Sequence, residues 1–349
     1  MNSTQPTGPS AGSPNPAPSP APAPGAPATG NTASNNTPAP PDHKASSLLI
    51  GNLCMLVAAL FWGLNVSVTK ALIPGEMTAH AITVVRLVGG AILFWFASAF
   101  VKCESIERQD WLKVLLGGFV GLFGFIYLFI TSLRYGSAID ISIIMTLPPI
   151  FVILIGVIFL HRRPGLLEYI GVVISFVGAA IVILGGANNE AHGSDDILGD
   201  LLAIASTVCY AFYLTILEGP TKKYKPVALL RWIFLCAAVP SLFLIPGMDR
   251  LPILHSHSAI PWVEIGFILL CPTFIAYFLV QPAMKRIGSE LVSIYQYLLP
   301  VFATISAVLM KIDRLRWIQV LAMVVIVIGM LFTTFGKRKR VEKEGQDDV

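Results

Sequence analysis

Polar and aromatic side chains stand at helical spacing within the long apolar stretches of this sequence, where they could bind a small molecule. Residues three or four apart lie on one face of a helix, so both can contact one ligand. Indole, phenol, hydroxyl and amide groups bind by stacking and hydrogen bonding, which suits a zwitterionic or partly apolar metabolite better than a polyanion. The candidate binding residues are Trp62 and Asn65, Tyr210 and Tyr213, Tyr277 and Gln281, Thr146, Gln296 and the adjacent Tyr297.

Arg86 adds a charge to this set, because it lies well inside the apolar stretch 79–101. A guanidinium at this depth can bind a carboxylate through two hydrogen bonds. It can equally hold the end of a neighbouring helix or extend to the membrane surface. Arg231, the nearest counterpart later in the chain, follows a lysine-rich segment, 222–225, so extension to the surface suits it better. The uncharged candidates also have an alternative role, in hydrogen bonds between helices.

Groups that could support catalysis or ion coupling are sparse. The acidic candidates for coupling are Asp140, Glu218 and Glu290, near the ends of apolar stretches. Asp140 and Glu290 begin such stretches, where an acid also suits the positive end of a helix dipole. The six histidines pair with no acid deep in an apolar stretch, and the five cysteines form no CxxC pair. We therefore expect no enzyme, no catalytic residue, no metal and no cofactor.

The composition requires a membrane. Hydrophobic residues make up 55% of the chain and charged residues 13%, with a mean hydropathy of +0.73, whereas soluble domains carry about 25% charged residues. A helix needs roughly 20 apolar residues to cross a bilayer. We therefore predict an all-α integral membrane protein with ten transmembrane helices, over 47–73, 79–101, 111–133, 140–160, 167–186, 199–218, 228–246, 261–282, 289–311 and 315–335.

The apolar part of the chain repeats. Pro149 recurs 151 residues later as Pro300 (300 minus 149), and Gly178 recurs as Gly329 at the same offset. Arg163 and Arg314, Arg134 and Lys285, and Glu168 and Gln319 match likewise. Because five helices is an odd number, the second unit enters the membrane in the opposite orientation, which makes the repeats inverted. Pro149 and Pro300 could be hinges between these units or fixed bends that shape a cavity.

This repeat divides the chain into five parts. Residues 1–44 form a Pro/Ala/Ser-rich cytoplasmic tail that is too poor in large apolar side chains to fold. The repeats cover 45–186 and 199–336, an extracytoplasmic linker covers 187–198, and a basic then acidic cytoplasmic tail covers 337–349. Lysine and arginine gather in the loops that face the cytoplasm when both termini lie inside, so the positive-inside rule favours that orientation in a plasma (inner) membrane. The basic run Lys337–Arg340 suits contact with anionic lipid better than with nucleic acid.

The segment from Leu56 to Lys70, with its Trp62-Gly63-x-Asn65 element, resembles the first helix of EamA-type transporters in the drug/metabolite transporter superfamily. The segment from Gly199 to Tyr213 resembles the sixth helix of that family, whose start usually reads Gly-Asp or Gly-x-x. Two helix exits, Leu147 to Pro164 and the segment ending at Asp313-Arg314-Leu315, resemble a further family element in which an acid precedes an arginine. The first copy departs from that element, because Arg162 replaces the acid and His161 a usual glycine, which removes any salt bridge that acid would make.

The resemblance covers about 47–335 and implies a secondary transporter, commonly an exporter, for a small metabolite such as an amino acid. Alternating access between the two inverted repeats is the implied mechanism. One alternative is a nucleotide-sugar or phosphorylated-metabolite antiporter of the same superfamily, which would be expected to carry basic pairs deep in late helices. Lys311, Arg314 and Arg316 lie at a helix end and loop instead. Another is a non-transporting membrane scaffold. The expected partners are the lipid bilayer and the small-molecule substrate, without nucleic acid, for a monomer or homodimer.

Overall fold

The structure is a computed structural model that describes residues 43–73, 75–160, 165–187, 194–247, 252–256 and 258–347. Residues 1–42 of the amino-terminal tail, residues 188–193 of the linker, and the repeat landmark Arg163 lie outside these described residues. Within the described residues the secondary structure is helical and contains no strand. The all-α prediction is confirmed.

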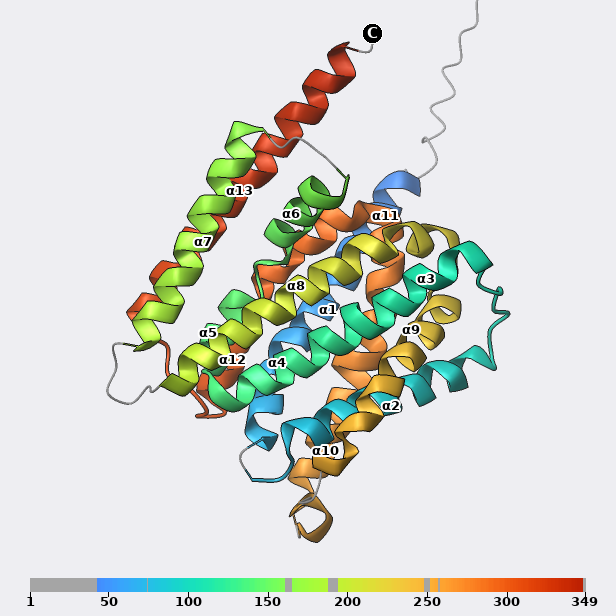
Figure 1. The fold of residues 1–349 in the computed structure, drawn as a ribbon, viewed down its shortest axis with the longest axis vertical. Helices are drawn as coiled ribbons and strands as arrows, with labels where there is room; N and C mark the ends of the chain where they lie inside the picture. The colour runs from blue at the N-terminus through green and yellow to red at the C-terminus, as the bar shows by residue number, and fades with distance from the viewer. Residues whose placement is uncertain are drawn as a thin grey trace, which may run out of the picture. The chain divides into compact units, whose positions relative to one another are not determined.

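The described residues of the first half form seven α-helices and one π-helical segment, whose arrangement Figure 1 shows. Thr78 caps α2 by accepting a hydrogen bond from the Ala81 N–H at 3.2 Å, and Ser137 caps α5 by accepting one from the Asp140 N–H at 3.3 Å. The elements are α1 (His43–Leu72), α2 (Ala79–Ser98), α3 (Arg108–Leu116), η1 (Gly117–Phe123), α4 (Gly124–Tyr135), α5 (Ala138–Ile144), α6 (Pro148–Leu160) and α7 (Leu166–Ala187).

The second half contains a similar series. Pro226 occupies the first turn of α9, where its missing N–H would have no partner in the helix. The elements are α8 (Ser194–Lys223), α9 (Pro226–Ser241), the 3₁₀ segments η2 (Leu242–Gly247) and η3 (Pro252–His255), α10 (Ile260–Ile268), the π-helical segment η4 (Leu269–Ile275), α11 (Ala276–Ile294), the 3₁₀ turn η5 (Tyr295–Tyr297), α12 (Leu298–Leu309) and α13 (Trp317–Asp347).

Eight helical segments of the described residues are long and apolar enough to cross a membrane, and two shorter apolar segments follow them. Together they coincide in order with the ten predicted transmembrane helices. The eight longer segments are Leu48–Leu72, Ala79–Ser98, Arg108–Tyr135, Ala138–Ile155, Leu166–Leu184, Asp195–Lys223, Pro226–Pro246 and Ile260–Ile287, and the shorter two are Tyr295–Leu309 and Trp317–Thr333. Large apolar side chains such as Phe96, Phe243 and Trp317 are exposed on these segments, as a lipid environment requires.

The repeat extends to the irregularities within the helices. The third membrane segment contains η1 and the eighth contains η4, each with seven π-helical residues. The fourth is broken between α5 and α6, and the ninth begins with the tight turn η5 ahead of α12. Single-turn π-helical segments and helix breaks in membranes are typical of functional sites. Their occurrence at matching positions shows that the repeat extends to the local geometry of the helices.

Helices from the two halves pack in pairs. The most extensive contacts join α7 to α13, α4 to α8, α1 to α11 and α12, and α2 to α9. Helices α7 and α13 lie side by side at the edge of the bundle (Figure 1), where Gly178 meets the Ile326 side chain so closely that a Cβ atom would lie 2.5 Å from Ile326 Cγ1. The repeat landmarks Gly178 and Gly329 therefore both serve close helix packing across this pair.

Candidate functional site

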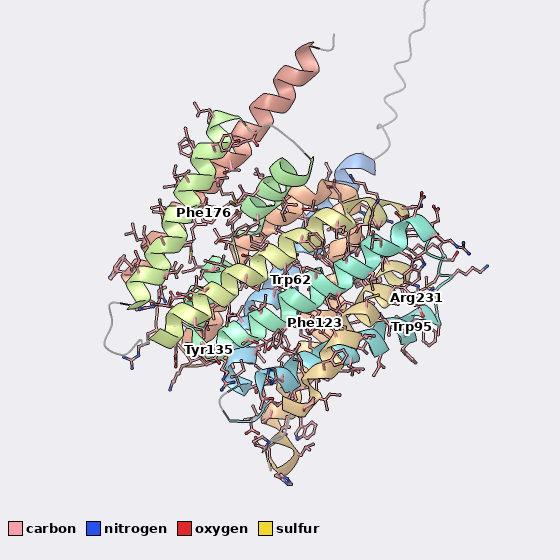
Figure 2. All side chains as sticks on the ribbon, in the orientation of Figure 1. Trp62, Trp95, Phe123, Tyr135, Phe176 and Arg231 are labelled. Atoms are coloured by element: carbon pink, nitrogen blue, oxygen red, sulfur yellow. The ribbon has the colours of Figure 1, made fainter. Side chains whose placement is uncertain are left out.

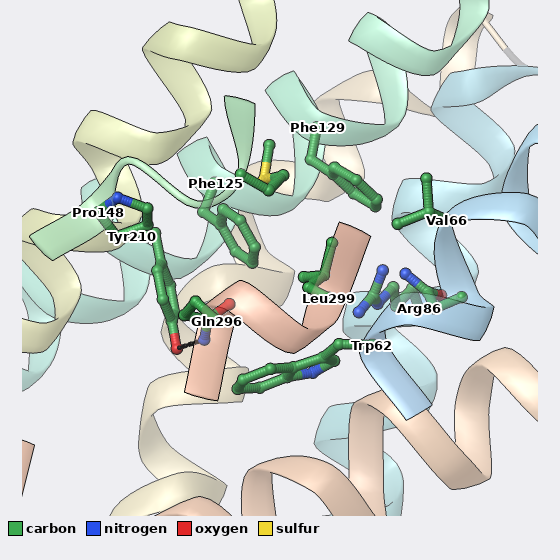
Figure 3. Close-up of a pocket in the computed structure, with 11 residues that line it drawn as sticks. Trp62, Val66, Arg86, Phe125, Phe129, Pro148, Tyr210, Gln296 and Leu299 are labelled. Carbon is green, nitrogen blue, oxygen red and sulfur yellow. Dashed lines mark hydrogen bonds between the residues drawn. The ribbon is translucent and has the colours of Figure 1, made fainter. Parts of the chain in front are cut away.

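A small cavity lies between α1, α2, α4, α8 and the two irregular segments at α5–α6 and η5–α12 (Figure 3). Its volume is about 30 Å³, measured as the space open to the centre of a water molecule, which is room for one or two waters. Apolar and aromatic surface predominates. The lining residues are Trp62, Asn65, Val66, Arg86, Phe125, Phe129, Met145, Pro148, Tyr210, Gln296 and Leu299.

Five of the ten residues predicted to bind a substrate line this cavity: Trp62, Asn65, Arg86, Tyr210 and Gln296. All five are buried. The Gln296 amide donates to the Tyr210 hydroxyl at 3.5 Å, and Thr69 donates its hydroxyl proton to Asn65 Oδ1 at 3.2 Å. The structure thus brings together candidates from three predicted faces and from both repeats.

Arg86 is the charged group of the cavity. Its side chain is 2% exposed, and its Nε donates to Thr273 Oγ1 at 2.9 Å, while Nη1 has no hydrogen-bond partner in the part of the chain that the structure describes. Thr273 in turn donates to the Ile268 carbonyl at 2.7 Å, which fixes its hydroxyl within the π-helical segment η4. Among the described residues, the ion pairs do not include Arg86. A buried cation without a counter-charge is costly, so this arrangement favours binding of an anionic group.

Trp62 forms one wall of the cavity and is held by the same π-helical segment. Its Nε1 donates to the Pro272 carbonyl at 3.1 Å. Its ring meets the rings of Tyr210 and Tyr277 edge to face, with centroids 6.2 and 5.7 Å apart. Figure 3 shows the indole along one side of the cavity, with Gln296 and Arg86 nearby. The segment η4 therefore positions both Trp62 and Arg86.

Three further candidates lie next to the cavity without lining it. Tyr277 contacts Trp62, and Tyr213 stacks on Tyr210 with ring centroids 5.9 Å apart. Gln281, one helical turn after Tyr277, is 1% exposed. Within the described residues, the hydroxyls of both tyrosines and both amide atoms of Gln281 lack hydrogen-bond partners of good geometry.

Thr146 and Tyr297 do not line the cavity either. The Thr146 hydroxyl donates to the Ile143 carbonyl of its own segment at 2.6 Å, while the Tyr297 hydroxyl is buried without a hydrogen-bond partner. Both residues belong to the irregular segments, next to the lining residues Met145 and Gln296.

The two repeat prolines stand at the beginnings of helices. Pro149 is the second residue of α6 and Pro300 the third residue of α12, where a missing N–H costs no hydrogen bond within the helix. The interruptions precede them, at 145–147 and at η5. The prolines therefore mark restarted helices and do not kink continuous ones.

Sequence reasoning missed part of the cavity wall, including Phe125 and Phe129. One of the missed residues was available from the repeat, because Met145 precedes the predicted Gln296 by the offset of 151 that relates Pro149 to Pro300. No comparable signal identifies Phe125 and Phe129 among the 20 phenylalanines of the chain.

Other singled-out charges lie outside the cavity. Arg231 stacks on Trp95 and Trp232, with its Cζ 5.3 and 5.5 Å from the ring centroids, and Figure 2 shows it beside Trp95 at the edge of the bundle. Asp140 accepts hydrogen bonds from Arg316 Nη2 at 2.6 Å and Gln319 Nε2 at 2.9 Å. This pairing supports a structural role for Asp140.

Lys70, the last charged residue of the family-like first helix, also serves packing. Its ammonium donates to the carbonyls of Leu133 and Gly136, at 2.6 and 2.8 Å, at the end of α4. Asp313 accepts from the Ser137 hydroxyl and from the Ile139 N–H at the start of α5. These contacts join helix ends and leave Arg86 as the cation of the cavity.

Comparison with known proteins agrees with this architecture. The model of the EamA-like transporter family matches residues 49–184 and 197–335. The chain is 26% identical to the uncharacterized transporter YdfC of Bacillus subtilis (strain 168) over 287 residues, or 82% of this chain and 89% of that one. It is 24% identical to the aromatic amino acid exporter YddG of Ancylobacter novellus over 272 residues, or 76% and 88% of the two chains. A crystal structure with 22% identity matches its fold with a TM-score of 0.58, over 84% of this chain and 98% of that one.

Proposed function

Because the chain belongs to the EamA-like transporter family, we propose that it moves a small metabolite with a carboxylate, such as an amino acid, across the membrane, and that Arg86 binds the carboxylate. The observation that carries this proposal is a guanidinium 2% exposed, in a largely apolar cavity, without an ion-pair partner among the described residues. Charge-assisted hydrogen bonds from such a group are about twice as strong as neutral ones.

A phosphorylated substrate is less well supported. A phosphate carries up to two charges and is usually bound by several cations, whereas Arg86 is the cationic side chain among the residues that line the cavity. The other basic group considered for phosphate, Lys311, Arg314 and Arg316, lines a separate groove in the connection between α12 and α13. One cation and neutral polar groups suit one carboxylate.

The walls of the cavity indicate the rest of the substrate. Trp62, Phe125, Phe129 and Tyr210 present aromatic surface to the same cavity as Arg86. An amino acid with an apolar or aromatic side chain would bury that side chain against these rings. The similarity to a protein named as an aromatic amino acid exporter supports this class and the outward direction.

The small volume of the cavity has a mechanistic consequence. At about 30 Å³ it holds one or two waters, so the halves must separate for an amino acid to enter. The restarted helices at Pro149 and Pro300 border the cavity through Pro148 and Leu299, and we assign the hinges of alternating access to them. By the positive-inside rule both termini lie in the cytoplasm, and the protein belongs in a plasma (inner) membrane.

The test is binding and transport with purified protein in lipid vesicles, using the common amino acids as probes. We expect Arg86→Gln to weaken carboxylate binding at least tenfold at unchanged yield of folded protein. Arg86→Lys should also fail if the contact is bidentate. Arg231→Gln is the matched control, because Arg231 stacks on tryptophans outside the cavity. Equal binding by the wild type and Arg86→Gln would refute the role of Arg86, and absence of any transported amino acid would favour phosphorylated substrates or a scaffold.

A further inference from the structure

A group of polar atoms without partners lies behind Trp62, between α8 and α11. It consists of the hydroxyls of Tyr213 and Tyr277 and the amide oxygen and nitrogen of Gln281. These side chains are 2%, 1% and 1% exposed. The Tyr213 hydroxyl faces the Gln281 amide, but neither completes a hydrogen bond of good geometry. Buried polar groups in proteins are almost always hydrogen-bonded, so several orphaned atoms at one place indicate a ligand.

The chemistry of this group favours a cation that donates hydrogen bonds. Two hydroxyl oxygens and one amide oxygen offer three acceptors, which matches the three N–H donors of an ammonium. The surrounding rings of Trp62, Tyr213 and Tyr277 present π-surface that attracts a cation. No carboxylate acts on either tyrosine among the described residues, so the group offers neutral oxygens and aromatic faces.

This group adjoins the carboxylate site. Arg86 donates to the Thr273 hydroxyl at 2.9 Å, and Tyr277 follows Thr273 by four residues, about one helical turn. Trp62 separates the group from the cavity, since its ring contacts both Tyr210 and Tyr277. Because Arg86 is positive, an ammonium beside it is repelled unless a carboxylate on Arg86 offsets that charge. The two sites together therefore favour a zwitterion over a simple amine.

We propose that Tyr213, Tyr277 and Gln281 form an ammonium subsite, so that the substrate is an α-amino acid bound by its carboxylate at Arg86 and by its ammonium at this subsite. The inference rests on the proposed function, because it assumes the carboxylate at Arg86. The Trp62 ring, which contacts both Tyr210 and Tyr277, would have to move for the subsite to join the cavity.

The experiment measures dissociation constants by calorimetry on the full-length protein in lipid nanodiscs. The probes are L-phenylalanine, 3-phenylpropionate, which lacks the ammonium, and 2-phenylethylamine, which lacks the carboxylate. We expect the wild type to bind L-phenylalanine at least tenfold more tightly than either analogue. Tyr277→Phe and Gln281→Leu should reduce that preference over 3-phenylpropionate to less than threefold while leaving 3-phenylpropionate binding unchanged. Tyr169→Phe, at a lipid-facing tyrosine that is 49% exposed, is the control.

Arg86→Gln separates the two proposals. It should weaken L-phenylalanine and 3-phenylpropionate together and strengthen 2-phenylethylamine, because it removes the repelling charge. If Arg86→Gln weakens both carboxylates but Tyr277→Phe and Gln281→Leu leave the preference for L-phenylalanine intact, the subsite is overturned and the proposed function stands. If the wild type binds none of the probes, or Arg86→Gln changes none of them, the carboxylate site fails and the subsite with it.

Discussion

Removal of the Asp140 carboxylate should destabilise the protein without changing the lining of the cavity, because Asp140 is not a lining residue. Asp140 pairs with Arg316 at 2.6 Å, and the two side chains are 4% and 21% exposed. Breaking a buried ion pair by removing one partner costs about 3 to 5 kcal/mol. Because Arg316 is partly exposed to water, we expect the loss of this ion pair to lower the free energy of unfolding by only roughly 2 to 3 kcal/mol. The lost bond from Gln319 adds about 1 kcal/mol, giving roughly 3 to 4 kcal/mol for Asp140→Ala.

The assay is reversible denaturation by sodium dodecyl sulfate in mixed micelles, followed by circular dichroism. Asp140→Asn keeps the shape and an acceptor for Gln319, so it should cost less than Asp140→Ala. The double variant Asp140→Ala/Arg316→Ala should cost clearly less than the sum of the singles, because each single already removes the pair. Additive effects, or a loss below about 0.5 kcal/mol for Asp140→Ala, would refute the estimate from burial.

Three further outcomes follow from described contacts. Gly178→Leu should lower the free energy of unfolding by about 1 to 3 kcal/mol, because the new Cβ would lie 2.5 Å from Ile326 Cγ1. Gly266→Leu is the control and should leave the free energy of unfolding unchanged, because a Cβ at Gly266 meets no neighbouring atom of the described residues within 4 Å. Denaturation of both variants measures the difference. Thr273→Val should weaken substrate affinity about fivefold, because it removes the hydroxyl that accepts the hydrogen bond from Arg86 Nε. Thr273→Ser keeps a hydroxyl and should bind substrate like the wild type. Unchanged affinity in the valine variant would contradict the role of Thr273 in positioning Arg86. Lys223 donates a hydrogen bond to the exposed Glu107, and this bond lowers the pKa of Glu107 in the folded protein. The contact therefore stabilises the protein above the pKa that Glu107 has in the unfolded chain, and this stabilisation is lost as the pH falls through the lower pKa of the folded state. Glu107→Gln should remove that part of the acid sensitivity, measured as the unfolding midpoint between about pH 5 and pH 3.

The membrane segments were predictable because the bilayer fixes their length and composition. The expected helix 79–101 corresponds to Ala79–Ser98, and 261–282 to the longer Ile260–Ile287. Helical spacing placed Trp62 and Asn65 on one face, and both residues line the cavity. Helical spacing also predicted Thr146 as a binding residue, but Thr146 does not line the cavity. The helix is interrupted at 145–147, and helical periodicity does not continue across an interruption.

Other features depend on contacts between segments far apart in the sequence. Tyr277 and Gln281 share a helical face, but only the position of the Trp62 ring decides that they lie behind the cavity wall. The π-helical segments have no periodic signal of their own. Their glycine and proline content, as at Gly117-Gly118 and Pro272, is common to many helices of this chain.

The matched π-helical segments explain why the site requires both repeats. In the second repeat, η4 holds Trp62 and Arg86 of the first through the Pro272 carbonyl and the Thr273 hydroxyl. In the first repeat, η1 packs against α8 and α9 of the second. There Gly121 approaches Tyr213 so closely that a Cβ atom would lie 2.9 Å from Tyr213 Cβ. Each half thus positions binding residues of the other. If the halves rock against each other as proposed, Arg86 and Tyr213 change orientation together, which would couple binding at the two proposed subsites to the exposure of the site.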